Sequence, residues 1–139
     1  MSSVQKSLRI PDDVAKTIQD EAESSGRDFS TVANELLAEA VKLKRCPGIV
    51  FADGPAGRRA RIAGTGLDVW EIVSTYKSLN RDDARLGDAY HWLSEPQLRS
   101  ALSYFRLYPD EIDRQIARNE AWNMDQLADR HPSLVQDRS

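Results

Sequence analysis

Residues 5–14, with the sequence QKSLRIPDDV, decide the fold of the first part of this chain. Side chains alternate in character over residues 5–10, which is the pattern of a short β-strand, and Pro11 ends strand pairing because it has no N–H. One isolated strand of this length is not stable alone. Its simplest partner is the same strand from a second copy of the chain. Two such strands form an antiparallel ribbon of the kind that enters the major groove of DNA.

Two amphipathic helices are predicted after this strand. The first spans residues 12–25 and the second residues 30–45, with Asp28 or Ser30 as the N-cap of the second. Their apolar faces are formed by Val14, Ile18 and Ala22 in the first helix and by Val32, Leu36, Leu37, Ala40 and Val41 in the second. So few apolar side chains make too small a core for this part of the chain, about 45 residues long, to be stable as a monomer. We therefore predict an intertwined dimer.

This order of strand and helices, over residues 3–45, resembles the ribbon-helix-helix family of repressors and antitoxins. The resemblance rests on residues 7–14 (SLRIPDDV), on Gly26 and on residues 30–37 (STVANELL). In that family the outward strand residues read base edges, and the N-terminus of the second helix holds a backbone phosphate. Carried over by position, the resemblance implies base reading by Gln5, Ser7 and Arg9 and phosphate binding by Lys6, Ser30 and Thr31.

The chemistry of these residue types suits DNA recognition. Arg9 has the donors for guanine O6 and N7, and Gln5 has the donor and acceptor for adenine. A helix N-terminus offers free N–H groups to an anion. The alternative is a ribbon that holds the dimer together without reading DNA.

A β-hairpin is predicted after residues 46–48, which end the second helix. Its strands are expected near residues 49–51 and 59–63. Six basic side chains and one acidic one fall within residues 42–61. Such a local excess fits an anion-binding surface, and the alternative is a set of solvated loop charges. Arg58, Arg59 and Arg61 are the candidate additional contacts to DNA or a partner.

Three further helices are predicted from periodicity. The first covers residues 69–79 behind Asp68 as N-cap, the second residues 81–90, and the third begins after Ser94. The short link of residues 91–93 is typical of a helix-turn-helix.

Two functions remain open for this helix-turn-helix. If it binds DNA, Gln97 and Arg99 on its third helix would make the contact; otherwise it contacts protein. Trp70 and Trp92 are expected in the core.

Residues 46–108 resemble the family called domain of unknown function 433. The resemblance rests on PGIV (47–50), RIAGT (61–65), VWEIV (69–73) and YHWLS (90–94). It implies a homeodomain-like helix-turn-helix domain of the kind found in VapB-type antitoxins, whose neighbouring genes often encode toxins with a PIN-like nuclease fold. The chain departs from that pattern at Gly66, where the family usually has Arg, at His91, where it has Pro, and at Gly87, where a larger residue is usual.

The C-terminal part, residues 109–139, contains seven acidic and four basic side chains. A helix is predicted over residues 109–121, and the helical periodicity fades from Asn123 onward. The spaced apolar side chains that follow are Met124, Leu127, Leu134 and Val135. Such a segment can become ordered on a partner protein. The alternatives are a frayed terminus or docking onto its own dimer.

Composition narrows the class of protein. The net charge is −3, the chain has one cysteine, and no apolar run approaches the length of a membrane span. Together with an N-terminus unlike a signal peptide, these features predict a cytoplasmic, nucleoid-associated protein. His91, His131 and Cys46 have no catalytic or metal-binding companions in sequence, so we expect no enzyme, cofactor or metal.

The sequence thus predicts a mainly α protein in three parts. These are a ribbon-helix-helix domain (1–45), a hairpin with a three-helix helix-turn-helix domain (46–108), and a C-terminal helix with a partner-binding tail (109–139). The expected function is a DNA-binding antitoxin of a type II toxin–antitoxin pair. It would repress its own operator as a homodimer and neutralise a nuclease toxin with its C-terminal part; dimer or tetramer on DNA is left open.

Two rival interpretations belong to other classes. One is a stand-alone transcriptional regulator or chromosome-organising DNA-binding protein without a toxin. The other is an oligomerisation scaffold that touches no nucleic acid, which the net charge of −3 favours.

Overall fold

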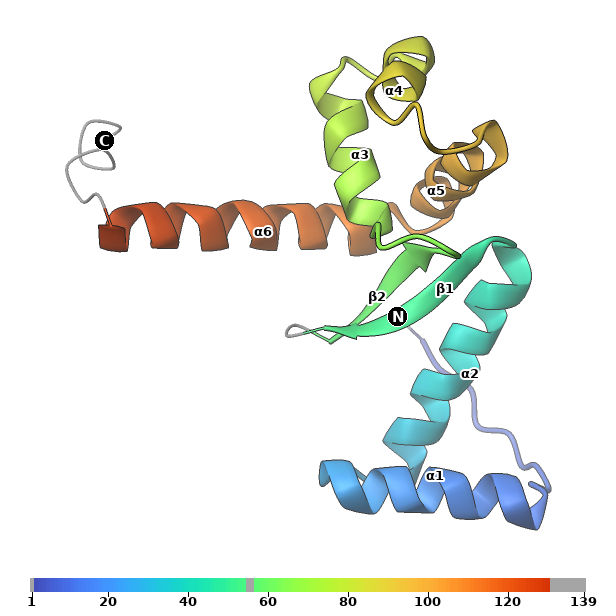
Figure 1. Ribbon diagram of the computed structural model, residues 1–139. Coiled ribbons are helices and arrows are strands. Elements are labelled where there is room, and N and C mark those ends of the chain that lie inside the picture. Colours follow the sequence, from blue (N-terminus) through green and yellow to red (C-terminus); the bar gives the residue numbers. More distant parts are fainter. Residues whose placement is uncertain (1, 55–56, 131–139) are drawn as a thin grey trace. The chain divides into compact units, whose positions relative to one another are not determined.

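The computed structural model describes residues 2–54 and 57–130, and these residues are mainly helical (Figure 1). The helices are α1 (Asp12–Ser25), α2 (Phe29–Arg45), α3 (Val69–Ser78), α4 (Asp83–Ala89), α5 (Glu95–Leu107) and α6 (Pro109–Arg130). Strands β1 (Ile49–Gly54) and β2 (Gly57–Ile62) form an antiparallel hairpin. The chain divides into two compact units, residues 1–44 and 45–139. No helix of the described ranges is both long and apolar enough to cross a membrane.

The first unit contains α1 and most of α2, joined by a tight turn. Gly26 ends α1 in the left-handed conformation, with φ +68°, which a residue without a Cβ adopts readily. The Thr31 backbone N–H donates to Asp28 Oδ1 at 2.8 Å, so Asp28 caps α2 and the choice between Asp28 and Ser30 is decided.

The predicted strand of residues 5–10 is absent from the described single chain. Residues 2–11 have no regular secondary structure. The physical reason is that a strand needs a hydrogen-bonding neighbour, and the predicted neighbour belongs to a second chain. The ribbon therefore stays a prediction.

The second unit is built on the β1–β2 hairpin. Ile49 pairs with Ile62 and Phe51 with Ala60, which places these four side chains on one face of the hairpin. This face joins a core of buried side chains from the helices, including Ile72, Tyr104 and Ile112. Helix α3 packs against β2, α5 and α6.

Helix starts in this unit follow the predicted capping chemistry. The Asp68 backbone N–H donates to the Glu71 carboxylate at 2.8 Å at the start of α3. At the start of α5, Ser94 and Gln97 form a reciprocal capping box with distances of 2.8 and 3.2 Å. These two starts confirm the predicted N-caps.

Two predictions in this unit are wrong in detail. Trp92 is 62% exposed rather than in the core, because Leu93 takes the buried position of the α4–α5 turn. Helix α6 continues past residue 121 to Arg130, so Met124 and Leu127 lie on a helix rather than in a loose segment. Leu134, Val135 and His131 lie outside the described residues.

Candidate nucleic-acid interface

The predicted DNA-reading residues lie in the N-terminal segment and are all accessible. Gln5, Lys6, Ser7 and Arg9 are exposed. The apolar Leu8, which alternates with them, is also exposed. A strand in this segment would place Leu8 on the opposite face from Ser7 and Arg9. The polar side chains predicted to read DNA and the apolar Leu8 are thus all exposed in the single chain.

Helices α1 and α2 bury little of their predicted apolar faces. Ile18, Ala22 and Val32 are buried, with Phe29 and Ala33 packed against them. The other side chains of the predicted apolar faces are exposed, including Leu37 at 54% and Val41 at 55%. We call Val14, Leu36, Leu37, Val41 and Leu43 the uncovered apolar face of the first unit. Exposed large apolar side chains gathered on one small unit favour an interaction surface.

The predicted phosphate site at the start of α2 already contains a carboxylate. The Thr31 N–H donates to Asp28. Hydrogen bonds from the Thr31 side chain and then from its backbone lower the pKa of Asp28. Ser30 is exposed beside them. A phosphate at this helix end would therefore share its amide donors with an internal anion.

The three arginines of the hairpin are engaged in ion pairs. Arg58 Nη1 lies 3.1 Å from Asp53 Oδ1. On the opposite face of the hairpin, Arg59 Nε and Arg61 Nε lie 3.2 and 3.0 Å from the two carboxylate oxygens of Asp68. Much of the local positive charge is thus balanced within the unit.

Asp68 is the centre of this arrangement. Asp68 is only 4% exposed, and the Trp70 indole N–H also donates to its carboxylate at 3.1 Å. A carboxylate this buried requires such partners. The sequence identified Asp68 only as an N-cap, since nothing in its spacing places it against β2. The arginines therefore hold the hairpin to the start of α3 and are less available to DNA than predicted.

The candidate contacts on α5 are also used within the chain. Gln97 Oε1 accepts from the Ser94 backbone N–H at 2.8 Å, and Arg99 Nη2 lies 2.6 Å from Glu95. Arg99 is exposed and its ion pair is a surface one, which is easily exchanged for another partner.

The second unit also buries titratable groups away from the hairpin. The Tyr104 hydroxyl donates to the Glu111 carboxylate, which ties α5 to α6. Burial first, and then this hydrogen bond, raise the pKa of Tyr104. Cys46 is buried in the core. Among the residues the structure describes, no group of three His, Cys, Asp or Glu side chains could hold a metal ion.

Comparisons with known proteins give one structural likeness. No protein-family model matches the chain, and no curated protein matches it. The chain is similar to the crystal structure of a DUF433 member protein from Anabaena variabilis, with 28% sequence identity and a TM-score of 0.43. That match covers 73% of this chain and 96% of the other.

Proposed function

We propose that this protein is a DNA-binding antitoxin of a type II toxin–antitoxin pair. Its first unit would pair with a second copy as a ribbon-helix-helix dimer and repress its own operator, and its C-terminal part would neutralise a PIN-like nuclease toxin. The observation that carries the DNA-binding half is the set of exposed apolar side chains on α1 and α2, preceded in the chain by an exposed N-terminal segment that contains Gln5, Ser7 and Arg9.

Dimer formation is supported by the size of the first unit's core. Three buried side chains, with two packed against them, serve residues 12–44 of the described chain. Covering side chains such as Leu37 and Val41 with a second copy yields up to about 1.5–3 kcal/mol for each one fully buried. A partner strand would also satisfy the backbone of residues 5–10.

DNA reading is supported by what the paired strands would present. Gln5, Ser7 and Arg9 are all accessible, and they would share one face if residues 5–10 formed a strand. An antiparallel pair of these segments fits the major groove, where each side chain has a base edge to meet. Lys6 and the start of α2 would then lie near the phosphates on either side.

The toxin-binding half is supported by the exposed second part of α6. None of residues 117–129 is buried, and this stretch has Glu120, Asp125 and Asp129 against Arg118. An acidic, exposed helix is electrostatically complementary to the basic RNA-binding surface of a nuclease.

The decisive experiment measures DNA binding by fluorescence anisotropy. A duplex from the gene's own upstream region is compared with a scrambled duplex, for wild type, Arg9→Ala and Lys16→Ala. Lys16 is an exposed cation of α1 in the same unit and serves as the charge control. We expect Arg9→Ala to lose about 1–3 kcal/mol of selective binding. Lys16→Ala should keep the preference for the operator duplex. Equal binding of both duplexes by the wild-type protein would refute DNA reading.

A stand-alone transcriptional regulator is the second candidate. It is favoured by the internal use of two acids of α6, since Glu111 binds Tyr104 and Asp113 binds Lys77 at 2.5 Å. This leaves a smaller acidic surface for a toxin. Co-expression with each neighbouring gene separates the two: the antitoxin relieves a growth defect and co-purifies with the toxin, and the regulator does neither.

A further inference from the structure

A groove lies between α4 and α5 in the second unit, with a volume of about 620 Å³. Its apolar lining consists of Leu86, Leu93, Leu98 and Leu102, and its charged rim of Asp83, Glu95, Arg99 and Arg106. The volume lies within the range of about 300–1,000 Å³ that is usual for ligand pockets. We call this the α4–α5 groove.

Gly87 keeps the groove open. It lies inside α4 and lines the groove, and a Cβ added there would have no heavy atom within 4 Å. Glycine is unfavourable inside a helix, and no positive φ requires it at this position. The missing side chain therefore coincides with empty space that another group can fill.

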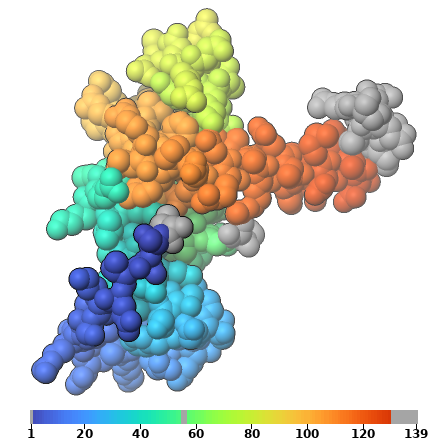
Figure 2. Space-filling view, turned by 180° about the vertical axis from the view of Figure 1, so that it is seen from behind, coloured from blue at the N-terminus to red at the C-terminus, as the bar shows by residue number. Residues whose placement is uncertain are grey.

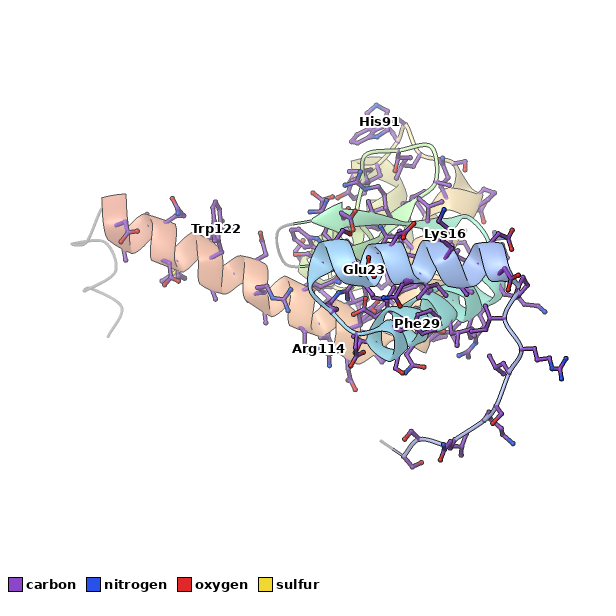
Figure 3. All side chains as sticks on the ribbon, turned by 90° about the horizontal axis from the view of Figure 1, so that it is seen from below. Lys16, Glu23, Phe29, His91, Arg114 and Trp122 are labelled. Carbon is purple, nitrogen blue, oxygen red and sulfur yellow. The ribbon has the colours of Figure 1, made fainter. Side chains whose placement is uncertain are left out.

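In the second half of α6, residues 117–130, none of residues 117–129 is buried. Figure 2 shows α6 running out beyond the hairpin and α3–α5, and Figure 3 shows the Trp122 ring projecting from it. Trp122 is 59% exposed. Asp125 and Asp129 follow at three and seven residues, so they share its face. We call residues 117–130 the arm.

The groove has an apolar floor and two arginines and two acids at its rim, and the arm has an exposed aromatic ring with two carboxylates on the same face. A tryptophan can bury about 150–250 Å² of surface, and the leucine-lined floor offers it an apolar site. On the rim, Arg106 has no ion pair among the described residues, and neither do Asp125 and Asp129 on the arm. Docking of Trp122 would bring these opposite charges together at the edge of the contact.

The groove cannot be filled by the arm of its own chain. Helix α6 is continuous from Pro109, so Trp122 lies about 20 Å along a rigid helix from the end of α5. To fold back onto α4 and α5, the helix would have to break. The occupant of matching chemistry is therefore the arm of another copy.

We propose that the arm of one copy docks in the α4–α5 groove of a second copy, with Trp122 on the leucine floor and Asp125 or Asp129 beside Arg106. Reciprocal docking closes the pair by two-fold symmetry. This contact goes beyond the proposed function, because it involves only residues 45–139 and requires neither DNA nor a toxin. It uses the same part of α6 that the proposed toxin contact would use, so a copy whose arm is docked in this way would not bind a toxin through that arm.

Disulfide cross-linking between copies tests the contact. One variant has a cysteine in the groove wall (Ser103→Cys) and the other a cysteine on the arm next to Trp122 in space (Gln126→Cys). The two are mixed, allowed to exchange and oxidised mildly. We expect a disulfide-linked pair on a non-reducing gel. The matched control replaces Ser103→Cys with Ser78→Cys, an exposed serine at the end of α3 away from the groove.

Two further substitutions test whether the cross-link depends on the groove and on Trp122. Gly87→Leu fills the groove without meeting a neighbour at its Cβ and raises helix propensity, so the chain should melt no lower than wild type. Trp122→Ala alters an exposed side chain and spares the fold. Each should abolish the cross-link. Cross-linking equal to the Ser78→Cys control, or unchanged by both Gly87→Leu and Trp122→Ala, would overturn the proposal.

The result is distinguishable from failure of the proposed function. Leu37→Glu, on the uncovered apolar face of the first unit, should abolish DNA binding and leave the cross-link in place. Conversely, Gly87→Leu should abolish the cross-link and leave the affinity of Arg9-dependent DNA binding within about twofold at matched concentration.

Discussion

The two units of this chain differ in how completely they bury their apolar residues. Residues 45–139 enclose a core of twelve buried side chains, centred on the hairpin, α3 and α5, within the described ranges. Residues 1–44 enclose three, while side chains such as Leu37 and Val41 remain exposed. The second unit has the features of an independently folding domain, and the first has those of half a domain. The difference supports the proposal that the first unit pairs with a second copy.

The largest expected effect comes from opening the core of the second unit. Ile72 is fully buried in α3, so Ile72→Ala should lower the free energy of unfolding of this unit by about 2–5 kcal/mol. Denaturant unfolding followed by tryptophan fluorescence measures it, since all three tryptophans lie in this unit. The half-exposed Val50→Ala is the control and should cost much less. Equal effects would mean that the hairpin and α3 do not form one cooperative core.

The next effect concerns the buried carboxylate that joins β2 to α3. Asp68→Asn leaves Arg59 and Arg61 without an anionic partner and should destabilise the second unit by about 2–3 kcal/mol. The same unfolding measurement applies.

The matched control for this change is Asp53→Asn. Its carboxylate pairs with Arg58 but is almost fully exposed, so the loss should stay below about 1 kcal/mol. If both substitutions cost the same, burial of Asp68 contributes nothing to the strength of its ion pairs.

A smaller effect is expected from the uncovered face of the first unit. Leu37→Ala should cost about 1–2 kcal/mol, and only in the assembled protein, because the side chain gains its burial from a second copy. Circular dichroism melts at several protein concentrations measure it. The melting temperature of the first unit should rise with concentration and that of the second should depend on it less. A concentration-independent first transition would contradict the proposed dimer.

The smallest effect is a pH dependence confined to the first unit. The bonds from Thr31 hold the pKa of Asp28 below its ordinary value of 3.8. The folded-state pKa is thus lower than the unfolded one, so the stabilisation is present above pH 3.8 and is lost as the pH falls through the folded-state value. Asp28→Asn should remove this acid dependence. Asp20→Asn, an exposed carboxylate on α1, is the control and should keep it.

Local sequence patterns predicted the helices and turns well. Gly26, Asp68 and Ser94 mark element ends through backbone conformation and capping, which depend on a few neighbouring residues. The antiparallel hairpin was predicted from a short apolar run at residues 49–51, a turn, and an alternating run at residues 59–63. Helix α6 was predicted too short, because beyond Asn123 its apolar side chains do not repeat at the spacing of a buried face.

For the candidate site, the sequence predicted some features correctly and missed others. Gln5, Ser7 and Arg9 are as accessible as a reading strand requires, but the strand itself depends on a second chain. For the hairpin arginines, the sequence showed the positive charge and missed its partner, since Asp68 reaches β2 only through the fold. The exposure of Trp92 was missed because helical spacing cannot tell which way a short turn directs its side chains.

The order of the elements, most of their ends, and the shortage of apolar residues in the first 45 positions all follow from the amino-acid sequence alone. These properties depend on local geometry and composition, which consecutive residues specify. Three features could be found only from the folded chain: Asp68 balances two arginines, Gly87 opens a groove between α4 and α5, and Trp122 is exposed on a continuous helix. Each of these depends on which distant residues approach one another, and packing of the whole unit sets those distances.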